Sequence, residues 1–178
     1  MSIDELAALV RTIPDFPKPG IQFRDITTLI ADPAGYGVLM DRLAEIARPL
    51  DADLVAGIEA RGFILGAALA HALGLGFVPI RKAGKLPGKT VGLDYVLEYG
   101  ADRLEVHEGQ VGEGARVLLV DDLIATGGTA VAAAQLLREQ GAEVLLALFA
   151  IDLPDLGGRA ALEADGIATK AILEFAGN

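Results

Sequence analysis

The chain has 178 residues, 52% of them hydrophobic and 22% charged, which is enough for one compact domain with a core and short for two. It contains no Cys, so disulfides and thiolate metal sites are excluded, and its net charge of −10 argues against nucleic acid as a partner. Because no apolar run approaches about 18 residues and the N-terminus is acidic, we expect no membrane span, no signal peptide and a cytoplasmic location.

The N-terminal part of the chain combines a helix signal with a proline-rich segment. Residues 2–5 have capping-box spacing and predict a short helix that ends near Arg11. The prolines within 14–19 then predict an extended, irregular segment. Phe23 and Arg24 follow in an otherwise polar loop, where they can stack on and hydrogen-bond a planar base. The alternative is that Phe23 only anchors this loop on the core.

The next segments predict a helix and then a strand–turn–helix unit. Asp32 and Pro33 have the types expected at a helix N-cap and first turn, and the apolar spacing continues to about Arg48. Residues 54–58 predict a buried strand, and Arg61 lies in the turn that follows it. In open α/β sheets such a turn faces the ligand crevice, so Arg61 can bind pyrophosphate; the alternative is an Arg in solvent at a helix start.

A basic segment follows the predicted strand at residues 77–80. Residues 81–89 hold four of the fifteen Lys and Arg of the chain, namely Arg81, Lys82, Lys85 and Lys89. Their Gly and Pro neighbours show no apolar period and predict a loop. A basic, mobile loop on an acidic protein suits a lid over a polyanion, although a solvated surface loop explains the same charges.

The central motif lies between residues 116 and 140. The apolar run 117–120 predicts a buried parallel strand, with Asp121 and Asp122 where it leaves the sheet. A turn of small residues precedes a predicted helix and consists of Ala125, Thr126, Gly127, Gly128 and Thr129. Free N–H groups at the helix start, close approach at the glycines and two hydroxyls favour a bound phosphate there.

The acidic pair restricts which phosphate the turn can bind. Two carboxylates would repel a phosphate unless they face hydroxyl groups or a cation. A ribose phosphate meets this condition, with its hydroxyls donating to Asp121 and Asp122 and Mg²⁺ nearby. Neither the P-loop nor the G-x-G-x-x-G fingerprint is present. The alternative is an ordinary strand–helix connection with two solvated aspartates.

The string VLLVDDLIATGGT at 117–129 closely resembles the phosphoribosyl pyrophosphate (PRPP) motif of type I phosphoribosyltransferases. The strings FPKPGIQFRDITTLI, GIEARGFILG and RKAGKLPGKT resemble the adenine-specific branch of that family, so the resemblance extends from about residue 14 to residue 175. It implies a single α/β domain over 1–178, with a mainly parallel sheet of about five strands flanked by helices. A small hood at about 1–30 and a mobile catalytic loop at about 81–98 are also implied.

The resemblance further implies the reaction and the residues that perform it. The reaction is the Mg²⁺-dependent conversion of adenine and PRPP to AMP and pyrophosphate in purine salvage, by a cytoplasmic homodimer. The implied catalytic residues are Glu98, as acid or base for the purine ring, Arg61 and Lys82. The implied PRPP-binding residues are Asp121, Asp122, Ala125, Thr126, Gly127, Gly128, Thr129 and Arg81. The implied base-binding residues are Phe23, Arg24 and Leu123.

Some further points follow from the resemblance. Mg²⁺ is expected to arrive with PRPP, with the two aspartates nearby and no certain protein ligand. The peptide bond between Glu59 and Ala60 is expected to be cis, and Arg81 or Lys82 can serve the neighbouring subunit.

Two alternative functions remain open. The central motif does not distinguish adenine from hypoxanthine, guanine or xanthine, so the choice of base depends on the hood and the segment around Glu98. A PRPP-sensing regulator would retain the site without the chemistry. Such regulators usually carry a DNA-binding domain, for which 178 residues leave little room.

Overall fold

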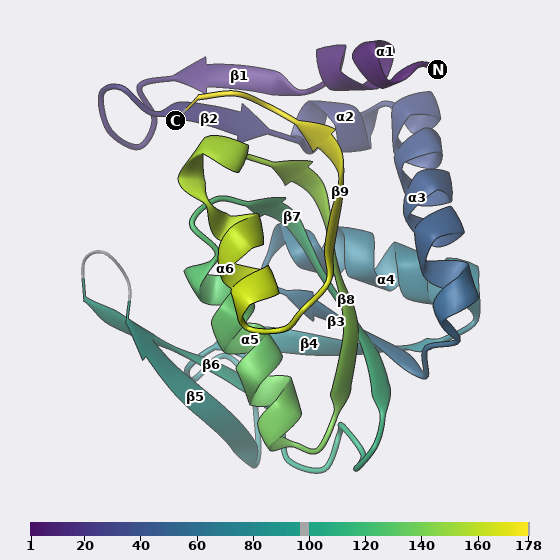
Figure 1. Cartoon of the computed structure of the whole chain (residues 1–178), viewed down its shortest axis with the longest axis vertical. Coiled ribbons are helices and arrows are strands. Elements are labelled where there is room, and N and C mark those ends of the chain that lie inside the picture. The colour runs from purple at the N-terminus through teal and green to yellow at the C-terminus, as the bar shows by residue number, and fades with distance from the viewer. Residues whose placement is uncertain (97–99, 178) are drawn as a thin grey trace.

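The computed structural model describes residues 1–96 and 100–177. Its main sheet has seven strands in the order β5-β6-β4-β3-β7-β8-β9, and β1 and β2 form a separate two-stranded sheet (Figure 1). The strands are β1 Arg11–Pro14, β2 Gln22–Asp25, β3 Leu54–Ile58, β4 Gly76–Lys82, β5 Thr90–Val96, β6 Ala101–His107, β7 Arg116–Ile124, β8 Glu143–Asp152 and β9 Thr169–Glu174. The helices are α1 Ile3–Ala8, α2 Thr27–Ala31, α3 Pro33–Ala47, α4 Arg61–Leu73, α5 Gly128–Glu139 and α6 Gly158–Ala164, with short 3-10 helices at Arg48–Leu50 and Pro154–Leu156.

The expected fold class is confirmed: a mainly parallel central sheet is flanked by helices. Strands β4, β3, β7, β8 and β9 run parallel, whereas β6 pairs antiparallel with β4 and β5 pairs antiparallel with β6. The sheet is therefore wider than the five or so strands expected. The two additional strands form an antiparallel hairpin that extends the sheet past β4.

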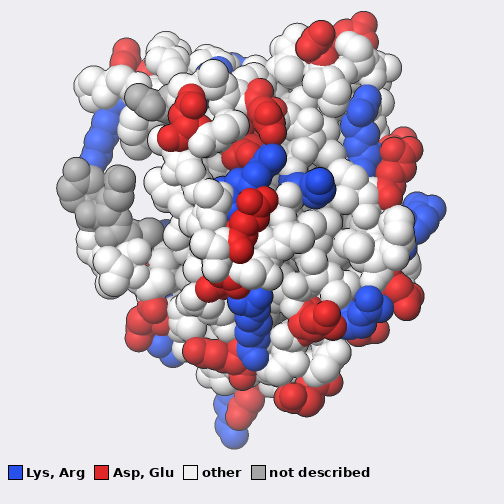
Figure 2. All heavy atoms as spheres, in the orientation of Figure 1, with Lys and Arg blue, Asp and Glu red and all other residues white. Residues whose placement is uncertain are grey.

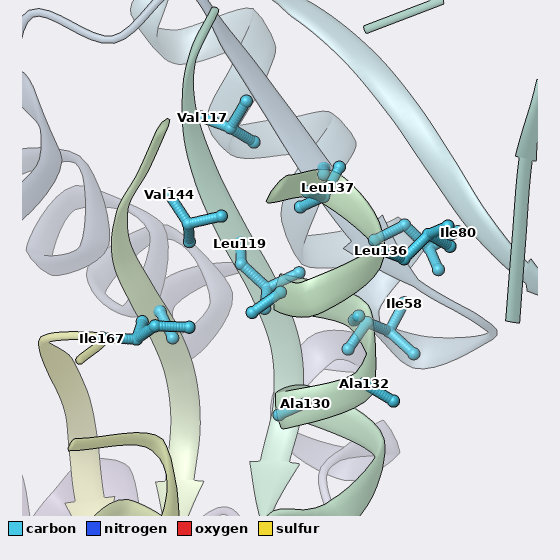
Figure 3. Packing of buried hydrophobic residues seen from close by; sticks show 14 of the residues in the cluster. Ile58, Ile80, Val117, Leu119, Ala130, Ala132, Leu136, Leu137, Val144 and Ile167 are labelled. Carbon is cyan, nitrogen blue, oxygen red and sulfur yellow. The ribbon is translucent and has the colours of Figure 1, made fainter. Parts of the chain in front are cut away.

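Alternate residues of β7 face two separate hydrophobic clusters. Val117 and Leu119 belong to the cluster beneath α5, together with Leu136 of that helix (Figure 3). Leu118 and Val120 belong to the cluster that α3 and α4 cover on the opposite face. All four side chains of the run are fully buried, which explains why it is apolar throughout rather than alternating.

The hood covers the carboxyl end of the sheet, and the C-terminal segment runs beside it (Figure 1). The capping box of α1 is present, with Ser2 and Glu5 bonding each other's backbone N–H. The helix ends at Ala8, however, and not near Arg11 as expected. Arg11 instead opens β1, because its backbone pairs with Asp25 of β2 and its guanidinium binds the same carboxylate.

Two other elements differ from expectation near the site. Strand β7 does not end at Val120 but continues to Ile124, because Leu123 and Ile124 pair with β8. Asp121 and Asp122 therefore lie within the strand. The segment expected to be a loop at 81–98 is shorter, since β4 extends through Lys82 and Thr90–Val96 form β5. The movement of this segment stays a prediction.

The surface on the viewed face carries Asp and Glu side chains scattered among Lys and Arg, without one large basic area (Figure 2). Among the helices of residues 1–96 and 100–177, none combines the length and apolar character that crossing a membrane requires.

The hood generates a prediction about stability and pH. The Asp25 carboxylate accepts hydrogen bonds from Arg11 Nε at 3.1 Å and from the Thr27 N–H at 2.9 Å. Burial opposes its ionisation, but these donors lower the pKa of Asp25 from 3.8 to about 2. A lowered folded-state pKa stabilises the protein at pH values above the unfolded-state pKa. This contribution disappears as the pH falls through the folded-state pKa.

We expect Asp25→Asn to lower the free energy of unfolding by about 1–2 kcal/mol near pH 7, less than the full shift implies because Arg11 is half exposed. The difference from the unsubstituted protein should close between about pH 4 and pH 2. Urea denaturation at several pH values measures it, with Asp41→Asn on the exposed side of α3 as the control. A difference that stays constant with pH would contradict this role of Asp25.

Candidate active site

The carboxyl ends of β3, β4 and β7 open onto one cavity of about 310 Å³. Parallel pairing sets Leu54–Gly57 of β3 beside Val117–Val120 of β7, so the turns that follow both strands meet at this edge. The residues that line the cavity are Ile58, Glu59, Ala60, Arg61, Lys82, Tyr95, Asp102, Asp121, Asp122, Leu123, Ile124, Ala125, Thr126, Gly127, Gly128, Thr129 and Ala130.

Arg61 and Asp122 form an ion pair across this edge. The Nε–H of Arg61 donates to Oδ2 of Asp122, whose side chain is only 6% exposed, whereas that of Arg61 is 43% exposed. Burial opposes the charge on the guanidinium, but Asp122 raises the pKa of Arg61 above its usual value. Arg61 therefore presents a permanent positive charge at the cavity while neutralising a buried carboxylate.

The environment of Asp121 disfavours its ionised form. Its Oδ1 accepts the backbone N–H of Asp122 at 2.8 Å. Burial, and then the neighbouring charge of Asp122, raise the pKa of Asp121 well above its usual range. A carboxylate in this setting is stabilised by any hydroxyl donor or cation that enters the cavity.

The turn before α5 has the geometry of an anion site. Gly127 is the N-cap of α5 and has a φ of 87°, a conformation that favours glycine. The first N–H groups of a helix lack intrahelical partners, and Gly128, Thr129 and Ala130 of this first turn all line the cavity. The start of α6 supports this turn, because the N–H of Gly158 donates to the carbonyl of Ala125 at 2.9 Å.

The hairpin of β5 and β6 forms the remaining wall of the cavity. Lys82 Nζ lies 3.0 Å from Asp102 Oδ2, and the Tyr95 hydroxyl lies 3.4 Å from the Thr129 hydroxyl. Neither Tyr95 nor Asp102 was expected from the sequence. The signal that could have found them is the pairing of β5 with β6, because Tyr95 and Asp102 are cross-strand neighbours.

The structure brings most of the expected residues together. The cavity is lined by Arg61, Lys82, Asp121, Asp122, Leu123 and the five residues of the turn, Ala125, Thr126, Gly127, Gly128 and Thr129. Phe23 of the hood lies beside them, with its ring centroid 5.6 Å from the guanidinium carbon of Arg61. The peptide bond between Glu59 and Ala60 is cis, as the resemblance implied.

Two expected residues are placed elsewhere, and the position of a third is not described. The Arg24 guanidinium donates to the Thr12 hydroxyl and to the carbonyl of Ala176, so it fastens the C-terminal segment to the hood. Arg81 donates to Glu59 and is not among the residues that line the cavity. Glu98 lies outside the described residues.

The chain resembles proteins of one family along its whole length. Residues 29–159 match the family model of the phosphoribosyl transferase domain. The adenine phosphoribosyltransferase of Sphingopyxis alaskensis is 62% identical over 174 residues, which are 98% of this chain and 95% of that protein. That of Erythrobacter litoralis is 60% identical over 178 residues, the full length of both.

The chain belongs to the adenine phosphoribosyltransferase family.

Solved structures of this family have the same fold. The adenine phosphoribosyltransferase of Thermoanaerobacter pseudethanolicus is 45% identical and superposes with a TM-score of 0.93, over 98% of this chain and 100% of that one. The enzyme from Saccharomyces cerevisiae, solved with adenine and D-2,5-dideoxy-2,5-imino-altritol 1,6-bisphosphate, is 38% identical with a TM-score of 0.89, over 96% and 98% of the two chains.

The resemblance to adenine phosphoribosyltransferases implies Mg²⁺, and the cavity fits an ion that is only partly held by protein. Across residues 1–96 and 100–177, no three His, Cys, Asp or Glu side chains are grouped closely enough to hold a metal. The cavity nevertheless has four carboxylates, Glu59, Asp102, Asp121 and Asp122, against two cations, Arg61 and Lys82. A polyanion would enter such a site more easily with a bound divalent cation, whose ligands would come largely from the phosphate oxygens of the polyanion.

Gly62 allows α4 to approach β7 closely beside the acidic pair. A Cβ atom there would lie 2.8 Å from Asp121 Oδ1 and 2.9 Å from the carbonyl oxygen of Val120, which is backbone and cannot rotate away. We expect Gly62→Ala to lower the free energy of unfolding by about 1–3 kcal/mol. The added methyl group would also displace the Asp121 side chain, and we expect this displacement to weaken PRPP binding.

Gly37→Ala is the matched control, because Gly37 also lies within a helix, but a Cβ atom there would meet no neighbouring side chain or element within 4 Å. An added methyl group at Gly37 should raise the free energy of unfolding by up to about 1 kcal/mol through helix propensity. Chemical denaturation and titration with PRPP measure both effects. Equal behaviour of the two variants would contradict the close packing at Gly62.

Proposed function

We propose that the protein transfers the phosphoribosyl group of PRPP to adenine, giving AMP and pyrophosphate in purine salvage. The observation that carries this proposal is the placement of an acidic pair and a glycine-rich helix start in one cavity. A ribose 5-phosphate needs both features, one for its hydroxyls and one for its phosphate. The full-length identity to adenine phosphoribosyltransferases supports adenine as the base.

The turn 125–129 is the proposed site of the 5-phosphate. Its backbone N–H groups and the hydroxyls of Thr126 and Thr129 supply hydrogen-bond donors, and the positive end of the α5 dipole adds to the attraction. Asp121 and Asp122 then accept from the ribose hydroxyls. Their negative charge also stabilises the positive charge that develops on the sugar as pyrophosphate leaves.

Arg61 and Lys82 are the proposed partners of the leaving pyrophosphate. Arg61 is charged and 43% exposed, so it can contact a phosphate while its Nε stays near Asp122. Lys82 faces the same cavity from the end of β4. Mg²⁺ bound with PRPP would neutralise part of the pyrophosphate charge and make it a better leaving group. Arg81 is proposed to act less directly, because Glu59 holds its guanidinium.

The base is proposed to lie between the hood and β7. Phe23 lies close to Arg61, and Leu123 lines the cavity, so both can contact a purine face. Arg24 is proposed to hold the hood in place rather than to touch the base through its side chain. Glu98 is proposed as the proton acceptor or donor for the purine ring, from the family pattern alone.

We also propose a cytoplasmic homodimer, as the resemblance implies. Sedimentation velocity distinguishes a dimer from a monomer, and a monomer at micromolar concentration would contradict the proposed homodimer.

The proposed reaction is tested by product analysis. The purified protein is mixed with Mg²⁺, PRPP and an equimolar set of adenine, hypoxanthine, guanine and xanthine, and the nucleotides are separated by chromatography. We expect AMP as the product. Another nucleotide would refute the base assignment, and PRPP binding without any nucleotide would favour a regulator.

The acidic pair supplies the control for this experiment. Replacement of Asp121 and Asp122 by Asn keeps the shape of both side chains and removes the charges that the proposal assigns to the transition state. We expect kcat to fall by about 10²-fold or more while thermal denaturation shows a folded protein. Near-normal turnover in the folded double variant would remove their proposed role.

A further inference from the structure

Lys82 already has a carboxylate partner at the site where the proposed function needs a phosphate. Its Nζ lies 3.0 Å from Asp102 Oδ2 on the neighbouring strand β6. The Lys82 side chain is 54% exposed and that of Asp102 is 24% exposed, so this pair stands at the mouth of the cavity rather than inside the core. An ammonium group bonded to Asp102 is not available in full to an incoming pyrophosphate.

Asp102 is held in place for this contact by its own strand and by the opposite one. The backbone N–H of Arg103 donates to Asp102 Oδ1 at 2.9 Å, which leaves Oδ2 for Lys82. Tyr95 is directly opposite Asp102 in the hairpin, and its hydroxyl lies 3.4 Å from Thr129 in the proposed phosphate turn. The carboxylate is therefore fixed in the wall of the cavity beside Lys82.

The charges of the two groups reinforce each other. The hydrogen bond and charge of Asp102 raise the pKa of Lys82, and the backbone bond from Arg103 together with Lys82 lowers the pKa of Asp102. Both groups are thus charged at neutral pH. A carboxylate next to a pyrophosphate site would also repel that ligand directly, so its presence needs a reason.

We propose that Asp102 is a positioning residue that holds Lys82 in the ligand-free protein and releases it to the pyrophosphate group of PRPP. The carboxylate and the pyrophosphate compete for one ammonium group. This inference rests on the proposed function, because it takes Lys82 as a partner of pyrophosphate.

The competition predicts that removing the carboxylate charge strengthens binding. Asp102→Asn keeps the size of the side chain and its bond to the Arg103 N–H, but it no longer competes as an anion. We expect the Kd of magnesium pyrophosphate, measured by isothermal titration calorimetry, to fall about two- to fivefold, the range of a half-exposed ion pair. The KM for PRPP should fall in the same direction while the KM for adenine is unchanged.

Asp165→Asn is the matched control. Asp165 has the same side-chain exposure of 24% and forms an ion pair with Arg138 at 2.9 Å, but neither residue lines the cavity. We expect the Kd to be unchanged in this variant. Thermal denaturation of all variants tests whether a change in Kd reflects partial unfolding.

A double-mutant cycle separates competition for Lys82 from simple repulsion. Lys82→Met should weaken pyrophosphate binding, and in that background the effect of Asp102→Asn should lose most of its size. An equal effect of Asp102→Asn in both backgrounds would show repulsion only and overturn the inference. Unchanged or weaker binding in the single Asp102→Asn variant would overturn it as well.

The same set of variants distinguishes failure of this inference from failure of the proposed function. If Lys82→Met binds pyrophosphate as tightly as the unsubstituted protein, the role of Lys82 in the proposed function is wrong, and the role of Asp102 falls with it. If Lys82→Met weakens binding and Asp102→Asn does nothing, only the role of Asp102 is wrong.

Discussion

The ion pair between Arg61 and Asp122 is the interaction on which the rest of the site depends. It exists because β3 and β7 are parallel neighbours, so their carboxyl ends and the turns that follow them lie side by side. A buried carboxylate without a partner would be costly, and Arg61 removes that cost in the ligand-free protein. The same pairing places a permanent positive charge at the mouth of the cavity.

The second constraint is that carboxylates outnumber cations around the cavity. Each of the four carboxylates has a donor: Glu59 accepts from Arg81 and the Lys82 N–H, Asp102 and Asp122 bind cations, and Asp121 accepts a backbone N–H. Binding of pyrophosphate at Lys82 would therefore exchange an existing contact with Asp102. The competition proposed between Asp102 and pyrophosphate rests on this contact.

The site was predictable wherever it consists of a strand, its turn and a helix that are continuous in sequence. The segments around Arg61 and at 117–129 are of this kind, because burial on both faces, glycine at a tight turn and an anion-binding helix start all leave local marks. The end of β7 was not predictable locally. Its acidic residues looked like the end of a strand, but pairing with β8 continues to Ile124.

Features that depend on pairing between distant strands were missed for the same reason. The strands β1 and β2 have only four residues each and show no apolar alternation, and the Arg11–Asp25 pair that joins them spans fourteen positions. Tyr95 and Asp102 belong to the site only through the register of the hairpin. Arg24 was expected at the base, but the C-terminal segment returns to the hood and supplies the carbonyl that it binds.

The proposed function depends above all on the turn 125–129 holding the 5-phosphate while the acidic pair holds the ribose. A crystal structure with AMP and magnesium pyrophosphate is the decisive test. We expect that the phosphate of AMP bonds the N–H groups at the start of α5, that the ribose hydroxyls donate to Asp121 and Asp122, and that Arg61 contacts pyrophosphate. A phosphate bound away from this turn, or a ribose out of hydrogen-bond reach of both aspartates, would contradict the proposal.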